Sequence, residues 1–357
     1  MLFAGILGHR DLAERLLGEL QSRASHAYLL SGPRGVGKAL VATSLAHALL
    51  CERSPGANFC CTTGQCPARR AAMTTTRGRS TGSTAAPHCE CCSSCVQIAA
   101  GVHPDFTRIG RAANRTDVLI EQVRELIAQL GIKPSRGSRR IAIIDDAETL
   151  NIPAQNALLK TLEEPPGHAI IFMIASSERS LLDTVRSRMR LVRFPALGLT
   201  DIEAILRARG TADESRAVAI ARLARGSAAR ALALADGDEP PMKELLDGMA
   251  RAHALDFSAI QQLAQQFFSS REQAADNFEL LARLLEEILC SKLLGVKFAA
   301  PLAEKPMLEL ARIAPTAGLV ACLEGAVRAR EAIDAMANSR MQAEQWWMSA
   351  AEALRES

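Results

Sequence analysis

Short apolar runs, separated by segments of helical periodicity, characterise the first half of the chain. The runs are rich in β-branched and aliphatic side chains and lie at residues 27–30, 106–109, 141–144, 170–174 and 191–194. Strands that are apolar almost throughout are typical of a parallel sheet with helices on both faces, because both faces are then buried. The pattern therefore predicts an α/β domain over residues 1–195.

Beyond residue 195 the apolar positions recur at helical spacing, and no further strand pattern follows. Thr200 and Glu203 have the spacing of a capping box and predict the start of a helix there. The sequence Asp-Gly-Asp-Glu-Pro-Pro at residues 236–241 breaks the helical pattern, as a linker does. We therefore expect a small helical lid at residues 196–238 and an all-α domain at residues 239–357.

Composition and charge narrow the classes of function. Of the 357 residues, 48% are hydrophobic, and the formal net charge is only +3. A dedicated nucleic-acid-binding protein is expected to carry a concentrated basic face, so any contact with DNA must be local or shared with partners. The chain shows no leader sequence and no run of about 18 apolar residues, which predicts a cytoplasmic protein without membrane contact. Residues 61–88 lack periodicity and are expected to form a mobile insertion.

A glycine-rich segment follows the first apolar run and precedes a helical pattern. It contains Gly32, Gly35, Gly37 and Lys38 and ends in the spacing G-x4-G-K, followed by Ala39. In such a loop the backbone N–H groups bind phosphate oxygens, and the lysine neutralises the β and γ phosphates. The motif normally continues with a Ser or Thr whose hydroxyl binds Mg²⁺, so Ala39 removes one ligand of the ion.

Two carboxylates follow the third apolar run. Asp145 stands where P-loop hydrolases hold Mg²⁺ through its water shell, and Asp146 stands where one group of hydrolytic P-loop ATPases has a glutamate that activates water. The shorter Asp146 withdraws its carboxylate by about one methylene, and a displacement near 1 Å can cost about 100-fold in rate. Together with Ala39, this predicts that the chain binds ATP weakly or not at all and hydrolyses it poorly or not at all. The alternative is an active ATPase in which Asp146 is the base and water replaces the missing hydroxyl.

Two further motifs point to a family. Residues 156–166 read Asn-Ala-Leu-Leu-Lys-Thr-Leu-Glu-Glu-Pro-Pro, and residues 184–189 read Thr-Val-Arg-Ser-Arg-Met, a segment that contains Ser187 and Arg188. With these motifs after a phosphate loop, the chain resembles the subunits of bacterial clamp loaders, which belong to the AAA+ family. The resemblance implies that Arg188, with Ser187 in the same motif, is a trans arginine finger for the nucleotide of a neighbouring subunit. Met189 replaces the cysteine of the family motif.

Further expectations follow from the resemblance alone. It implies a non-motor subunit of the DNA polymerase III clamp loader, which helps to load a sliding clamp onto primed DNA and joins a hetero-oligomer through a C-terminal helical collar. The expected partners are the clamp-loader ATPase subunit (gamma/tau), the delta subunit, the clamp and the DNA, with ATP and Mg²⁺ bound mainly by neighbouring subunits. Polymerase activity would belong to the holoenzyme. A P-loop small-molecule kinase is a further alternative, which the Ser187-Arg188 pair and the long helical region disfavour.

Cysteines are concentrated in one segment: eight of the ten lie between Cys51 and Cys95, which in a reducing compartment favours a metal site over disulfides. Cys89, Cys92 and Cys95 follow a C-x2-C-x2-C pattern and supply three of the four thiolates of a structural zinc site. Cys51 matches the first ligand of the zinc module in bacterial clamp-loader subunits, so the resemblance favours a structural Zn²⁺ on Cys51, Cys89, Cys92 and Cys95. Cys60 is the main alternative ligand. Other candidates are Cys61, Cys66 and Cys91.

Overall fold

The computed structural model describes residues 6–22, 25–52, 92–111, 118–210, 214–236, 242–295, 304–334 and 337–354. The chain forms two compact units, Met1–Leu232 and Ala233–Ser357. The insertion expected at residues 61–88 lies outside the described residues, as do Cys60, Cys61, Cys66, Cys89 and Cys91.

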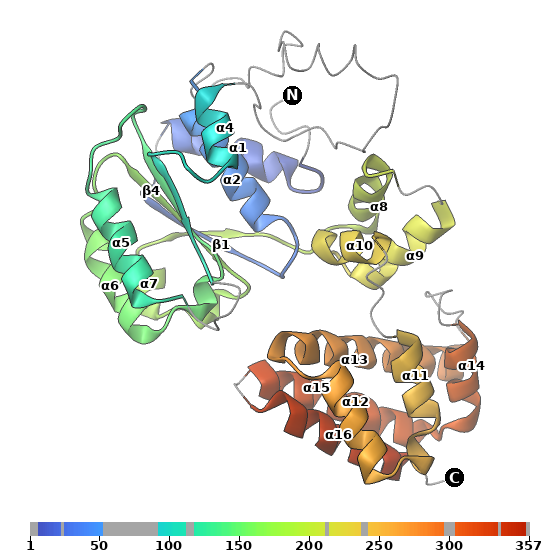
Figure 1. The fold of residues 1–357 in the computed structure, drawn as a ribbon. Coiled ribbons are helices and arrows are strands. Elements are labelled where there is room, and N and C mark those ends of the chain that lie inside the picture. Colours follow the sequence, from blue (N-terminus) through green and yellow to red (C-terminus); the bar gives the residue numbers. More distant parts are fainter. Residues whose placement is uncertain are drawn as a thin grey trace. The chain divides into compact units, whose positions relative to one another are not determined.

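A five-stranded sheet forms the centre of the first unit (Figure 1). Its strands are all parallel, in the order β2-β3-β4-β1-β5. Their bounds are β1 Ala27–Ser31, β2 Phe106–Ile109, β3 Arg140–Ile144, β4 Ala169–Ala175 and β5 Arg190–Arg193. The predicted parallel α/β core is confirmed, and the strand ends differ from the prediction by at most one residue. Every residue of the three interior strands is buried, which explains their continuous apolar sequence.

Helices cover both faces of this sheet (Figure 1). One layer consists of α1 (Arg10–Ser22), α2 (Lys38–Leu50) and α4 (Ser93–Ala99), and the other of α5 (Ile120–Leu130), α6 (Ile152–Glu163) and α7 (Asp183–Arg186). Successive side chains of a strand point to opposite faces, so Tyr28 and Leu30 join the first layer, whereas Ala27 and Leu29 join the second. Two short 3-10 helices, η1 (Ala147–Thr149) and η2 (Glu178–Ser180), follow β3 and β4.

Three helices follow β5, namely α8 (Leu199–Ala208), α9 (Glu214–Ala224) and α10 (Ala228–Ala235). The predicted capping box of the first one is wrong, because α8 begins before Thr200 and its cap residue is Gly198. The N–H of Gly198 donates to Asp201 Oδ2 at 3.3 Å. Asp201 thus takes the place expected for Glu203, since a carboxylate three residues after the cap reaches the cap N–H.

The first turn of α10 contacts the glycine-rich loop at Gly35. The N–H of Ala229 donates to the carbonyl oxygen of Gly35 at 3.1 Å. Gly35 has a φ of +76°, and a Cβ atom at this position would lie 2.2 Å from Ser227 Oγ. Only glycine allows both the backbone conformation and the close approach, so the loop and the start of α10 are packed directly on each other.

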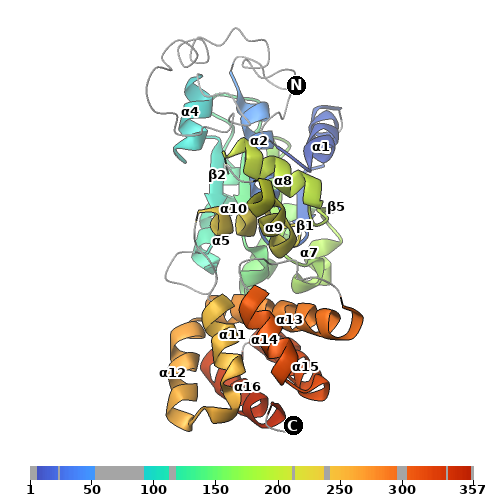
Figure 2. The same ribbon diagram turned by 90° about the vertical axis from the view of Figure 1, so that its right-hand side faces the viewer.

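The second unit is all-α, as predicted for the C-terminal region (Figure 2). Its elements are α11 (Met242–Ala250), η3 (Ala252–Ala254), α12 (Phe257–Phe267), α13 (Arg271–Leu294), α14 (Glu304–Ile313), α15 (Thr316–Asp334) and α16 (Ser339–Ala353). Trp346 and Trp347 are both buried, and Trp346 Nε1 donates to the carbonyl oxygen of Cys322 at 3.0 Å. Among the described residues no single helix is long and apolar enough to cross a membrane, and one pair, bent by 119°, meets the criteria jointly by length and composition only.

Candidate functional site

The glycine-rich loop joins the carboxyl end of β1 to the start of α2. Gly35 and Gly37 adopt left-handed conformations, with φ of +76° and +100°, and no side chain caps the N-terminus of α2. Uncapped N–H groups at the start of a helix attract anions. Lys38 is buried, and its Nζ donates to the carbonyl oxygens of Gly32 (2.6 Å) and Pro33 (2.7 Å). The ammonium group is therefore held by the loop itself, and burial lowers the pKa of Lys38.

Arginines pair with the acidic side chains after β3. Asp145 forms an ion pair with Arg108 of β2, and Arg111 Nε lies 4.0 Å from Asp146 Oδ2. Asp146 has a φ of +48°, and its N–H donates to Asp145 Oδ1 at 3.1 Å. Burial, followed by the charges of Asp145 and Glu148, raises the pKa of Asp146. The guanidinium of Arg108 thus supplies the positive charge beside Asp145 that a bound cation would otherwise supply.

Glu148 connects the same region to the glycine-rich loop. Arg34 Nη2 donates to Glu148 Oε1 at 3.4 Å, and the N–H of Ser176, after β4, donates to Glu148 Oε2 at 3.2 Å. Ala39 packs against the apolar core and offers no oxygen to a cation. Because parallel strands end at a common edge, this carboxyl edge of the sheet carries the predicted residues Gly32, Gly35, Gly37, Lys38, Ala39, Asp145 and Asp146.

Arg188 lies at the amino edge of the sheet, where the parallel strands begin, opposite to the carboxyl edge, where the strands end and the phosphate loop lies. With Ser187, it follows α7 and precedes β5, at the amino end of a strand that pairs in parallel with β1. β1 has five residues, so its two ends lie roughly 16 Å apart at about 3.3 Å per residue. Arg188 Nη2 lies 2.7 Å from Glu163 Oε1, and Nη1 donates to the carbonyl oxygen of Thr184 at 2.7 Å. The structure therefore separates Ser187 and Arg188 from the other predicted nucleotide-site residues.

Three buried cysteines meet between α2 and α4. Cys51 follows α2, Cys92 caps α4, and Cys95 lies in the first turn of α4. Their sulfur atoms lie within 4.8 Å of one another, and the Cys51 and Cys92 Sγ atoms are 3.8 Å apart. Zn–S bonds of about 2.3 Å at tetrahedral angles place ligand sulfurs about 3.8 Å apart. The three cysteines can therefore hold a metal ion such as zinc.

The environment of the cysteines also fits a cation. Hydrogen bonding to Cys51, followed by burial, raises the pKa of the Cys95 thiol, and burial raises that of Cys92. Buried thiolates need a positive charge nearby, which a metal ion supplies when it displaces the thiol protons. The fourth ligand is expected at Cys89 or Cys60, both of which lie outside the described residues.

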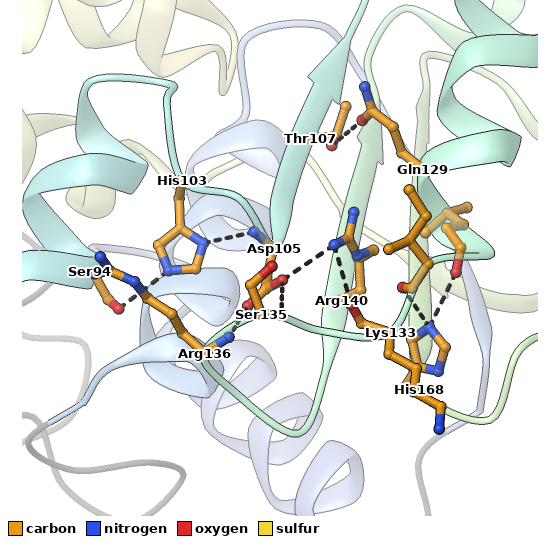
Figure 3. A network of polar contacts seen from close by, with 12 residues as sticks. Ser94, His103, Asp105, Thr107, Gln129, Lys133, Ser135, Arg136, Arg140 and His168 are labelled. Carbon is orange, nitrogen blue, oxygen red and sulfur yellow. Dashed lines mark hydrogen bonds and ion pairs between the residues drawn. The ribbon is translucent and has the colours of Figure 1, made fainter.

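A buried contact joins His103 to Ser94, which lies between Cys92 and Cys95 in the sequence (Figure 3). The N–H of Asp105 donates to His103 Nδ1 at 3.0 Å, so Nε2 carries the proton and donates to Ser94 Oγ at 3.1 Å. Ser94 Oγ in turn donates to Glu52 Oε1 at 2.9 Å. A nucleophilic serine must instead donate to its histidine. The contact therefore connects α4 to the start of β2 and does not form a hydrolase site.

Asp105 is the centre of the same polar network (Figure 3). Its carboxylate is fully buried and accepts the N–H groups of Ser135 (2.7 Å) and Arg136 (2.8 Å), and Arg140 Nη2 lies 3.3 Å from Oδ1. Burial alone would raise the pKa of Asp105, but the backbone donors and the arginine outweigh it, so the pKa lies below its ordinary value of 3.8. The carboxylate stays ionised and fixes the loop before β3.

Sequence reasoning missed the charged partners of the predicted residues. Arg108 reaches Asp145 because β2 and β3 are neighbours in the sheet, and Glu148, which follows β3, reaches Arg34 of the glycine-rich loop across the same edge. Glu163, the last residue of α6, forms an ion pair with Arg188 that sequence reasoning did not anticipate. One signal was available for Arg108, which is the charged position within the otherwise uncharged run at residues 106–109.

Comparison with known proteins gives matches in sequence and in structure. A family model described as "DNA polymerase III, delta subunit" matches residues 8–77 and 69–198. The DNA polymerase III subunit delta' of Pseudomonas aeruginosa is 33% identical over 177 residues, which cover 49% of this chain and 45% of that protein. Subunit tau of Escherichia coli is 35% identical over 240 residues, or 66% of this chain and 32% of that protein. A DNA polymerase III gamma subunit-related protein from Thermotoga maritima is 17% identical, with a TM-score of 0.43, over 96% of this chain and 99% of that chain.

A parallel sheet with a phosphate loop after β1 and acidic residues after β3 defines a P-loop α/β protein. Within that class, the chain belongs to the DNA polymerase III delta-subunit family, a clamp-loader family of AAA+ proteins in DNA replication. The matched regions span less than half the length of the two DNA polymerase III subunits from Pseudomonas aeruginosa and Escherichia coli.

Proposed function

We propose that the chain is a delta prime subunit of the clamp loader, a non-motor AAA+ subunit that donates Arg188 to the ATP of a neighbouring ATPase subunit. Arginine donated in trans stabilises charge that develops on the γ-phosphate, and such fingers contribute about 10³- to 10⁵-fold in rate. The neighbouring ATPase would be a gamma/tau-type subunit, and the assembly would load a sliding clamp onto primed DNA. Polymerase activity would belong to the holoenzyme.

The separation of Arg188 from the phosphate loop supports donation to another subunit. The loop lies at the carboxyl edge of the sheet and Arg188 at the amino edge, a strand length of roughly 16 Å away. An arginine side chain is too short to span this distance, so the phosphate loop of the same chain is out of reach of Arg188. The separation therefore supports a role toward a nucleotide bound by another subunit.

The chain's own phosphate site supports the non-motor part of the proposal. Ala39 offers no ligand to Mg²⁺, and the carboxylate of Asp145 is paired with Arg108. Asp146 is shorter than the glutamate that positions water in the hydrolytic relatives. We therefore expect weak or no ATP binding and little or no hydrolysis by this chain.

The remaining parts of the proposal are a zinc site and a collar. A structural Zn²⁺ would be bound by Cys51, Cys89, Cys92 and Cys95, with Cys60 as the alternative fourth ligand. Four cysteine ligands leave no open coordination position, so the ion would stabilise the fold and take no part in chemistry. The second unit would join the collar of the hetero-oligomer.

The test is the ATPase rate of a clamp loader assembled from the ATPase subunit, the delta subunit and this chain. Arg188→Ala is expected to lower the clamp- and DNA-stimulated rate at least about tenfold, because the transition-state charge loses its donor. Arg186→Ala is the matched control, because it removes the same charge from the same segment. Arg186 itself forms a local ion pair with Asp183. If the complex assembles and Arg188→Ala has the same ATPase rate as Arg186→Ala, the donated arginine is refuted and the chain has only a scaffold role in the complex.

An active ATPase of the gamma/tau type is the second candidate. The similarity to subunit tau of Escherichia coli, at 35% identity, favours it, as does the retained Lys38. Turnover of ATP by the isolated chain separates the two candidates. A rate that is abolished by Lys38→Ala would identify an active ATPase, whereas the absence of turnover agrees with a non-motor subunit.

A further inference from the structure

Glu163 and Arg188 meet at the amino edge of the sheet, although 25 residues separate them in sequence. Glu163 is the last residue of α6, and Arg188 lies between α7 and β5. The two elements are packed together because Leu158 and Leu162 of α6 and Val185 of α7 share one apolar core. The packing of these buried side chains therefore fixes the positions of Glu163 and Arg188 relative to each other.

Arg188 is held at two of the three nitrogens of its guanidinium group. Nη1 donates to the carbonyl oxygen of Thr184 (2.7 Å) and to Ser187 Oγ (3.4 Å), and Nη2 contacts Glu163 Oε1 at 2.7 Å. A guanidinium has five N–H donors; the two hydrogen bonds use those of Nη1, and Nη2 forms the ion pair. The Nε–H group has no hydrogen-bond partner within the described part of the chain. With 35% of the side chain exposed, Arg188 can bind an incoming anion without leaving its anchors.

We propose that Glu163 is the positioning residue of Arg188 in the assembled clamp loader. This inference rests on the proposed donation of Arg188 to a neighbouring subunit. Glu163 does not touch the nucleotide. It limits the rotamers of the Arg188 side chain before the γ-phosphate of the neighbouring subunit arrives. The conformational entropy of this side chain is therefore lost before the reaction and does not add to the activation free energy.

A purely structural role for the ion pair predicts a different result. The side chains are partly exposed, at 35% for Arg188 and 50% for Glu163, and ion pairs that water can reach contribute little to folding. Removing the carboxylate should therefore leave thermal stability and assembly unchanged. A positioning role instead lowers kcat for ATP hydrolysis, with little change in KM for ATP, because the arginine acts on charge that develops in the transition state.

The experiment compares Glu163→Gln with Glu164→Gln in the reconstituted complex of the ATPase subunit, the delta subunit and this chain. Glu164 is the adjacent exposed carboxylate, so the control removes the same charge one residue away. Misplacement of a catalytic group by about 1 Å can cost about 100-fold, and we expect a fall in kcat of about tenfold for Glu163→Gln alone. The difference should narrow as ionic strength rises, since salt screens an exposed pair. In an Arg188→Ala background, Glu163→Gln should have no further effect.

The outcomes separate the inference from the function on which it rests. If Arg188→Ala lowers the rate but Glu163→Gln behaves like Glu164→Gln, donation of the arginine stands and the positioning role is refuted. A higher rate for Glu163→Gln also refutes it, because the carboxylate would then hold the arginine away from the nucleotide. If Arg188→Ala has no effect, both proposals are lost.

Discussion

At the scale of single residues, arginines neutralise the carboxylates at the carboxyl edge of the sheet. The pair of Arg108 and Asp145 is partly exposed, with 48% and 23% of the side chains accessible. Such pairs are weak because water and salt compete for both charges. Displacing Arg108 should therefore cost little, and the proposed loss of Mg²⁺ binding rests more on Ala39, whose side chain has no hydroxyl.

Asp105 leads to a prediction about stability. Asp105→Asn should lower the free energy of unfolding by about 3 kcal/mol, because it removes a buried charge whose partners remain buried. Urea denaturation followed by circular dichroism measures this. Asp183→Asn is the control, since Asp183 is paired with Arg186 but is 89% exposed and should change little.

The effect of Asp105 should depend on pH. Its pKa in the folded protein is lower than the ordinary value of 3.8, so its ionisation stabilises the fold above about that pH. This contribution is lost as the pH falls through the lowered folded pKa. The difference between native protein and Asp105→Asn should therefore shrink in acid, and a difference that is constant from neutral to acid pH would contradict the assignment.

Single residues of the site could be predicted from the sequence where the residues of a motif follow one another closely along the chain. The glycine spacing before Lys38 identified the phosphate loop because all residues of the motif are close together in the sequence, between Gly32 and Lys38. The partners of Asp145 and Arg188 come from other elements, and the apolar pattern does not specify which elements are neighbours. The roles of Asp145, Asp146 and Arg188 stay predictions until the assembled complex is assayed.

At the scale of elements, the cysteine cluster joins two helices that are far apart in sequence. Cys51 at the end of α2 and Cys92 at the start of α4 are separated by 41 positions, yet their sulfur atoms are in contact. α4 has only seven residues and cannot be stable alone. In the structure, α4 is held on the domain by the burial of Ile98 and by the hydrogen bond from Ser94 to Glu52. A metal ion would add bonds between α4 and Cys51, which follows α2.

Metal content is the corresponding prediction. The purified protein should contain about one zinc ion per chain, and Cys92→Ser should reduce the content to near zero because it removes a ligand. Cys290→Ser is the control, since Cys290 is exposed on α13 in the second unit. Elemental analysis measures the result, and Cys89→Ser and Cys60→Ser then identify the fourth ligand. Full zinc content in Cys92→Ser would contradict the site.

The strands were predictable because each interior strand is buried on both faces and reads as an apolar run. The order of strands was not, because the runs carry no information about which strands are neighbours. The start of α8 was misplaced because Thr200 and Glu203 also match the capping pattern, and the backbone selected Gly198 and Asp201. Local patterns of this kind often compete within a few residues of a helix end.

At the scale of the whole molecule, the two units have separate cores. The first is built on the parallel sheet, and the second on helices α11 to α16. The division between the two units falls between Leu232 and Ala233, within α10, and the domain boundary predicted at residues 238–239 stays a prediction. Units with separate cores can unfold separately.

Unfolding of the two units should be measurable independently. Both tryptophans of the chain, Trp346 and Trp347, lie in α16, so tryptophan fluorescence reports on the second unit alone. Circular dichroism reports on both units. We expect Asp105→Asn to move the transition seen by circular dichroism and to leave the fluorescence transition in place. A shift of both by the same amount would mean that the units unfold as one.

The length of β1 has a consequence for how such a protein can evolve. Sites separated by more than about 10 Å and without shared partners respond to substitution almost independently. The roughly 16 Å between the ends of a five-residue strand therefore makes the phosphate loop and the arginine edge separate targets of selection. A substitution in the phosphate loop, such as Ala39 in place of a residue with a hydroxyl, is therefore expected to leave Arg188 unaffected, so that one end of the strands can change during evolution while the other is kept.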